Sequence, residues 1–144
     1  MIRILYALLL MSVFAFADTE LAKPLPSIDN QRQILFSIKS GNEEDINHVL
    51  STANNVLKFY GPEKVHMRIV CYYHGIKTVL KKEKKIAVRV DALQQYGVEF
   101  VACHNTMKTL HIKEEDLDDD VEVVSAGVAE IAERIKEGWI YIAP

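Results

Sequence analysis

The feature that most constrains the fold of this 144-residue chain is a regular alternation of short apolar segments with longer amphipathic ones. The short segments have strand character, because their apolar residues either alternate with polar ones or run without interruption. Strands that alternate with helices are typical of a parallel sheet covered on both faces, with right-handed crossovers. The predicted strands are Gln33 to Ser40, Val65 to Tyr73, Val98 to Cys103, Val121 to Val124 and Trp139 to Ala143.

The clearest helix follows Asn42, which is a good N-cap residue. Three acidic residues at 43–45 occupy the first turn, where the helix dipole favours negative charge. Apolar residues then recur at helical spacing as far as Tyr60, and Gly61 and Pro62 end the helix. The other predicted helices span Lys84 to Tyr96, Val128 to Lys136 (with Val128, Ile131, Ala132 and Ile135 facing inward), and short segments at Ile76 to Leu80 and Thr106 to Leu110.

The N-terminal residues have the pattern of an export signal. Arg3 gives a positive start, residues 4–14 are apolar apart from Ser12, and Ala15-Phe16-Ala17 fits a small-x-small cleavage site. The apolar stretch is well short of the ~20 residues of a spanning helix, so an uncleaved membrane anchor is the weaker alternative. We predict a periplasmic protein, cleaved after Ala17, with no stable membrane insertion thereafter. The predicted segments are a signal peptide at 1–17, an N-terminal arm or linker at 18–31 and a folded domain at 32–144.

The charge of the mature chain argues against a nucleic-acid partner. Of the 17 Lys and Arg residues, Arg3 belongs to the signal, so 16 remain against 20 Asp and Glu residues. Binding to phosphates requires a basic footprint, which this net negative chain lacks. The basic run at 81–85 and the acidic run at 114–120 are interpreted as solvated surface.

Cys103 is the strongest candidate for a functional residue. An apolar strand ends at this cysteine, and polar residues follow at once, which predicts a thiol exposed at the strand end. Ligands of open parallel sheets gather beyond the carboxyl ends of the strands, where His74 also lies, after the preceding strand. One interpretation of Cys103 is a small buried hydrophobe; the other is a thiolate nucleophile whose pKa is lowered at a helix N-terminus.

The second cysteine and the nearby histidines allow interpretations other than a reactive thiolate. Cys71 lies inside an apolar run and is expected to be a buried structural thiol, with a Cys71–Cys103 disulfide as the rival hypothesis. The two cysteines together are too few for a disulfide scaffold. His74, Cys103, His104 and His111 do not have zinc-site spacing, so no metal is predicted. The sequence also lacks hydrolase signatures and any cofactor motif.

Several motifs together resemble the DsrE/DsrF-like family, in its small single-domain branch that often carries an export signal. The match runs from about Gln33 to Pro144. The segments that carry it are His74-Gly75, the GVEFVACHNT segment at 97–106, the VVSAGVAEI segment at 123–131 and the EGWIYIAP segment at 137–144.

This resemblance implies a three-layer α/β/α sandwich with a mostly parallel sheet of about five strands. It also implies a homo-oligomer, as a dimer, trimer or hexamer. Relatives take part in sulfur relay, in which a cysteine at the matching position carries sulfur as a persulfide between a donor and an acceptor thiol or protein. By that match Cys103 is the acceptor, with supporting or ligand-binding roles for His74, Gly75, His104, Asn105 and Thr106. Two alternatives stay open: a non-catalytic oligomeric module that binds a small ligand or protein, and a redox sensor that uses Cys71 and Cys103.

Overall fold

A computed structural model describes residues 18–144, so the predicted signal peptide and its cleavage site lie outside the described residues. The arm at 18–31 contains no helix and lies against the start of the first strand. Arg32 Nη2 donates a hydrogen bond to the carbonyl of Ala22 at 2.6 Å, and Gln31 Nε2 donates to the carbonyl of Glu63 at 3.0 Å. Within residues 18–144, no helix is both long and apolar enough to cross a membrane.

Five strands form one sheet in which every pairing is parallel, and the strand order is β4-β3-β2-β1-β5. The predicted parallel α/β fold is therefore confirmed. The second strand ends two residues earlier than predicted, because Tyr73 has a left-handed backbone (φ 52°) and opens a 3₁₀ helix. The bounds are β1 Arg32–Ile38, β2 Val65–Cys71, β3 Glu99–Cys103, β4 Glu122–Val124 and β5 Ile140–Ile142.

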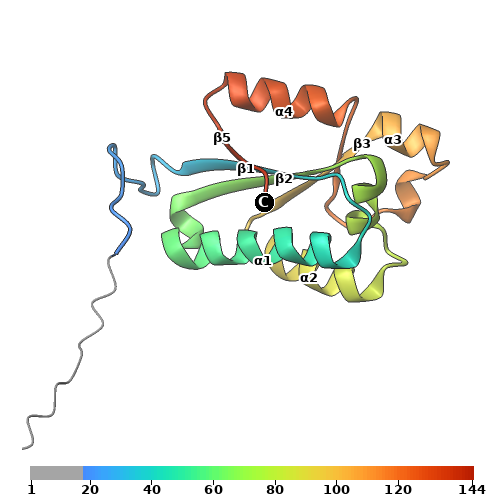
Figure 1. Cartoon of the computed structure of the whole chain (residues 1–144), viewed down its shortest axis with the longest axis horizontal. Coiled ribbons are helices and arrows are strands. Elements are labelled where there is room, and N and C mark those ends of the chain that lie inside the picture. The colour runs from blue at the N-terminus through green and yellow to red at the C-terminus, as the bar shows by residue number, and fades with distance from the viewer. Residues whose placement is uncertain (1–17) are drawn as a thin grey trace, which may run out of the picture.

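Helices cover both faces of the sheet, which gives the three α/β/α layers (Figure 1). The helices α1 (Glu43–Tyr60) and α2 (Lys84–Gln94) lie on one face, and α4 (Gly127–Lys136) lies on the other. The strands follow one another from β1 to β4 in one direction across the sheet, and β5 is then added on the other side of β1. Because all crossovers are right-handed, a crossover in the opposite direction places its helix on the opposite face of the sheet. The short helix α3 (His104–Thr109) lies beyond the end of β3. The remaining helical segments are η1 Pro62–Lys64, η2 Tyr73–Val79 and η3 Glu114–Asp116.

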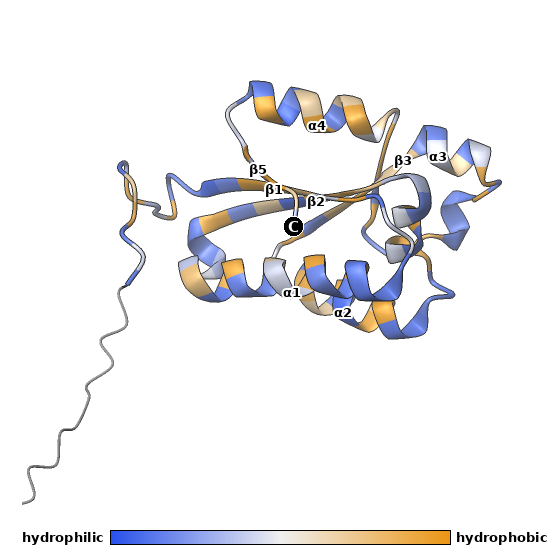
Figure 2. Cartoon of the chain, in the orientation of Figure 1, coloured by the Kyte–Doolittle hydropathy of each residue, from blue (hydrophilic) through white to orange (hydrophobic). Residues whose placement is uncertain are grey.

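The core has two parts of unequal size. The larger part lies between the sheet and α1 with α2, and it contains Phe36, Ile69 and Phe100, none of which is exposed. The smaller part lies beneath α4 and is built from Leu35, Val70, Val101 and Trp139. Figure 2 shows apolar residues concentrated in the central strands, while the helices carry both apolar and hydrophilic residues.

The orientation of α4 corrects one prediction. Val128, Ala132 and Ile135 were expected to face inward, but Val128 is 63% exposed, Ile135 is 45% exposed and Ala132 is also exposed. The positions that face the sheet are taken by Ile131, which packs on the smaller core, and by Glu130, which pairs with Arg68 of β2. The apolar stripe on α4 therefore points away from the sheet.

Candidate functional site: a buried thiol at the carboxyl edge of the sheet

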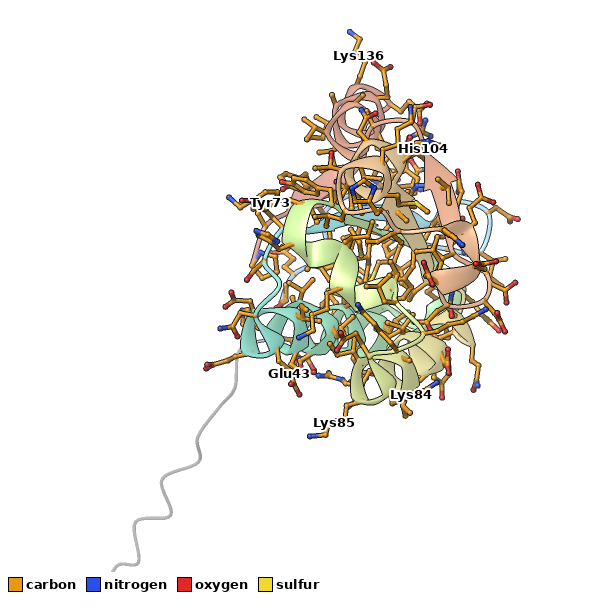
Figure 3. All side chains as sticks on the ribbon, turned by 90° about the vertical axis from the view of Figure 1, so that its right-hand side faces the viewer. Glu43, Tyr73, Lys84, Lys85, His104 and Lys136 are labelled. Carbon is orange, nitrogen blue, oxygen red and sulfur yellow. The ribbon has the colours of Figure 1, made fainter. Side chains whose placement is uncertain are left out.

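The carboxyl edge of the sheet brings together the loops that follow β2 and β3. These strands pair directly, so the segments that follow them are neighbours. The backbone N–H of Tyr73 donates to the hydroxyl of Thr106 at 3.0 Å, which ties the two segments to each other. Figure 3 faces this edge and shows Tyr73 and His104 on it.

Cys103 is the last residue of β3 and occupies the N-cap position of α3. Its predicted exposure is wrong, because the residue is only 6% exposed. The cover comes from the first turn of α4: a Cβ added at Gly127 would lie 3.2 Å from Cβ of Cys103 and 3.2 Å from Cβ of Tyr72. The absence of a side chain at Gly127 thus allows the α4 backbone to approach the thiol closely.

Hydrogen-bond donors converge on the sulfur of Cys103. Burial by itself raises the pKa of this thiol, but the hydroxyl of Thr106 and three backbone amides outweigh that effect and hold the pKa below its ordinary value. The amides belong to Gly127, Thr106 and Asn105, at the starts of α4 and α3. Because the Tyr73 N–H occupies a lone pair of the Thr106 oxygen, the Thr106 hydroxyl hydrogen remains available for the sulfur. These donors therefore stabilise the thiolate form of Cys103 relative to that of an ordinary cysteine.

Cys71 is separated from this site by the sheet itself. Cys71 is opposite Ala102 in the β2–β3 register, and residue 103 points to the other face because side chains alternate along a strand. Cys71 accordingly packs in the larger core, where burial raises the pKa of its thiol to about 12, against a smaller lowering by Thr78. Both thiols are free. This geometry disfavours the redox-sensor hypothesis, since a Cys71–Cys103 bridge would have to pass through the sheet.

Gly75 has a structural reason for being glycine. Its amide donates to the carbonyls of Lys39 and Tyr72, at 2.9 and 3.0 Å, and so fixes the start of η2 against the end of β1. A Cβ at this position would lie 2.0 Å from the carbonyl oxygen of Ile38. Gly75 thus supports the site through its backbone.

The polar residues around Cys103 do not all face it. The backbone N–H of Asn105 donates to the carbonyl of Ser125 at 3.3 Å and makes the smallest of the contributions that lower the pKa of Cys103. The side chains of Asn105 and His104 are exposed. His74 is exposed, and the centre of its ring lies 4.0 Å from that of Tyr73, with the two rings tilted by 52°. His74 also lines a separate cavity of about 630 Å³ with Lys77 and Lys82. Neither imidazole is among the groups that set the pKa of Cys103.

Sequence reasoning missed Gly127 and Tyr73. Gly127 begins the helix after β4, and β4 pairs with β3, with Val124 opposite Cys103. The signal in the sequence that could have identified Gly127 was its position after the neighbouring strand. A glycine there lets the backbone come close enough to the cysteine at the end of β3 to donate a hydrogen bond to its sulfur. Tyr73 had no such signal, since its role depends on the left-handed turn. In the part of the chain that the structure describes, no group of three or more His, Cys, Asp or Glu side chains has a geometry that could hold a metal ion.

Comparisons with known proteins agree with this fold. The model of the DsrE/DsrF-like family matches residues 33–144. A protein of unknown function from Methanobacterium thermoautotrophicum, MTH1491, is 31% identical with a TM-score of 0.73, over 77% of this chain and 97% of that one. A conserved protein of unknown function from Bacteroides thetaiotaomicron, BT1422, shares the fold at 13% identity and a TM-score of 0.58, over 78% of this chain and 95% of that one. No curated protein sequence matches significantly. Because the family model covers nearly the whole described domain, the chain belongs to the DsrE/DsrF-like family.

Proposed function

We propose that this protein is an exported sulfur carrier in which Cys103 holds sulfane sulfur as a persulfide. The observation that carries the proposal is the convergence of the Thr106 hydroxyl and three backbone amides on the sulfur of Cys103. The surroundings of Cys71 differ: one hydroxyl, that of Thr78, hydrogen-bonds to its thiol, and burial in the apolar core outweighs this and raises the pKa. Membership of the DsrE/DsrF-like family supports the same chemistry.

The donors suit both halves of a sulfur transfer. In the first half, the Cys103 thiolate attacks the sulfane sulfur of a polysulfide or persulfide, the donor S–S bond breaks, and the donor thiolate leaves with the electron pair. In the second half, an acceptor thiolate attacks the outer sulfur of the Cys103 persulfide, and the Cys103 thiolate leaves. Persulfidation is a reversible modification of a low-pKa thiol, and a low pKa also speeds departure of the thiolate. The same amides stabilise the sulfur anion at each stage.

Mass spectrometry of the mature protein after treatment with inorganic polysulfide tests this proposal. We expect the peptide that contains Cys103 to gain one sulfur atom and the peptide that contains Cys71 to gain none, because Cys71 is fully buried with a raised pKa. Cys71→Ser is the matched control and should keep the modification, whereas Cys103→Ser should lose it. Equal sulfur uptake on both cysteines, or none on Cys103, would contradict the carrier role.

The export part of the proposal depends on the sequence of residues 1–17. Sequencing of the N-terminus of protein recovered from the periplasmic fraction should begin at Asp18. Recovery of intact Met1 in the membrane fraction would instead support the anchor alternative.

A second candidate is a binding module that does not use the thiol. The cavity beside His74 favours it, since its volume of about 630 Å³ lies in the range of small-ligand pockets. Its walls are apolar at Ile76, Leu80 and Leu110, and cationic at Lys77 and Lys82. The test is complementation of a strain that lacks the protein. If the protein is a binding module, the Cys103→Ser variant should restore the lost function and the Leu110→Glu variant should not. If it is a carrier, Leu110→Glu should restore the function and Cys103→Ser should not.

A further inference from the structure

An ion-pair network connects the sheet to the first turn of α4. Its centre is the guanidinium of Arg68 in β2, whose side chain is 11% exposed. Arg68 pairs with Glu99 of β3, with Glu122 of β4 at 2.8 Å, and with Glu130 of α4 at 2.9 Å. His66 extends the network through a 2.9 Å contact with Glu99. The carrier chemistry does not use any of these side chains.

Glu130 is the one member of the network that lies in the first turn of α4. Its side chain is 14% exposed, and Oε1 lies 2.9 Å from Nε of Arg68 and 3.2 Å from Nε of Arg134. These two contacts are ion pairs without the alignment of hydrogen bonds. A buried carboxylate between two guanidinium groups fixes its helix to the strand beneath, since the charges cannot separate without a large loss of attraction.

The same turn of α4 covers Cys103. Gly127 lies three residues before Glu130, and its amide donates to the sulfur of Cys103. Val70, two residues after Arg68 on the same face of β2, contacts Gly127 closely: a Cβ added there would lie 3.2 Å from Cγ1 of Val70. Strand β2 therefore holds this turn at two points, through packing at Gly127 and through charge at Glu130.

We propose that Arg68 and Glu130 are a positioning pair that keeps the amide of Gly127 directed at the sulfur of Cys103. The inference rests on the proposed role of Cys103 as the working thiol. Neither side chain contacts the sulfur; each acts through the position of the first turn of α4. Loss of the pair should let this turn move away from the sheet and weaken the hydrogen bond to the thiolate.

The replacement Glu130→Ala separates positioning from simple charge. Removal of a nearby negative charge stabilises a thiolate and would lower the pKa of Cys103. Removal of the anchor weakens an amide donor and would raise that pKa. Alanine is the best helix former, so α4 itself should persist. The direction of the change therefore decides between the two effects.

The measurement is the rate of iodoacetamide alkylation of Cys103 as a function of pH, in the Cys71→Ser background. We expect the midpoint of the profile to move to higher pH in Glu130→Ala, with alkylation about threefold slower at neutral pH, because one of several donors to the charged sulfur is weakened. Glu133→Ala, which removes an exposed carboxylate of the same helix, should leave the midpoint unchanged. Thr106→Val removes the hydroxyl donor outright, so its midpoint shows how far the pKa of Cys103 rises when one hydrogen bond to the sulfur is lost completely.

Arg68→Lys provides a second variant that keeps the charge. Lysine lacks the planar fork that reaches several carboxylates at once, so the positioning role predicts a midpoint at higher pH here as well, whereas a pure charge effect predicts no change. Circular dichroism establishes that each variant is folded. If Glu130→Ala is folded and the midpoint of its alkylation profile is unchanged or lower, the proposal is overturned. If Glu130→Ala does not fold, the same result in Arg68→Lys overturns it.

The two proposals fail in distinguishable ways. If the parent protein takes up no sulfur from polysulfide but the midpoint moves as expected, the positioning pair stands and the carrier role falls. If the parent forms the Cys103 persulfide and the midpoint does not move, only the positioning pair is refuted.

Discussion

At the scale of single residues, a buried carboxylate makes the stability of the fold depend on pH. Asp118 is 8% exposed, and within residues 18–144 its Oδ2 atom has no hydrogen-bond partner. Burial is the main cause that raises its pKa above the ordinary value of 3.8, and Asp91 and Asp119 add to this, while Lys81 and Lys84 oppose it. Because the folded state binds this proton more tightly than the unfolded chain, Asp118 stabilises the fold fully below pH 3.8. That contribution is lost as the pH rises through the folded pKa.

We therefore expect Asp118→Asn to be more stable than the parent at neutral pH, by on the order of 1 kcal/mol, since a buried polar group without a partner costs about 1–3 kcal/mol. The advantage should shrink towards pH 3.8, where the parent carboxyl is protonated. Urea denaturation at several pH values measures the difference. Asp29→Asn is the matched control, because Asp29 is exposed and is not among the groups that shift the pKa of Asp118, and it should show little pH-dependent change. A constant difference between Asp118→Asn and the parent at all pH values would contradict the assignment.

At the scale of elements, the junction of β1 with η2 depends on close backbone packing. In Gly75→Ala the new Cβ would meet the carbonyl oxygen of Ile38 at 2.0 Å, so one of the two backbones must move. We expect a loss of stability of about 3 kcal/mol or more, in the range of severe core overpacking. Gly97→Ala is the comparison: its φ of +82° is unfavourable for alanine, but nothing lies within 4 Å of the new Cβ, so about 1–2 kcal/mol is expected. A smaller loss for Gly75→Ala than for Gly97→Ala in urea denaturation would refute this account of the His-Gly motif.

At the scale of the whole molecule, we propose that the outward stripe of α4 is the interface of the homo-oligomer that the family resemblance implies. Val128 and Ile135 are exposed on this helix, and Ile140 and Tyr141 of the edge strand β5 are exposed as well. We expect the double variant Val128→Lys with Ile135→Lys to sediment as a monomer while the parent sediments as a larger species, because two buried charges would oppose association. Val88→Lys is the control: Val88 is 69% exposed on α2, on the opposite face of the sheet. A parent that sediments as a monomer, or a charged double variant that still associates, would exclude this surface as the interface.

The sequence predicted the elements better than it predicted which way they face. The parallel sheet, the helices that flank it and the position of Cys103 at a strand end follow from periodicity and from the residues that end each segment. The orientation of α4 did not follow, because Glu130 and Arg134 occupy positions that hydropathy assigns to solvent. Only Arg68, more than 60 residues earlier in the chain, makes those positions favourable for charge.

The sequence by itself determined the fold class, the family and the thiol that deserves testing, because these depend on local periodicity and on short motifs. Tertiary structure alone decided that Cys103 is buried rather than exposed, that Cys71 lies on the other face of the sheet, and that the donors to the sulfur come from Gly127 and Thr106 rather than from His74 or His104. The physical reason is that a thiol's pKa depends on the few groups that touch it. These groups come from two separate segments, the starts of α3 and α4, which only the pairing of β3 with β4 brings together.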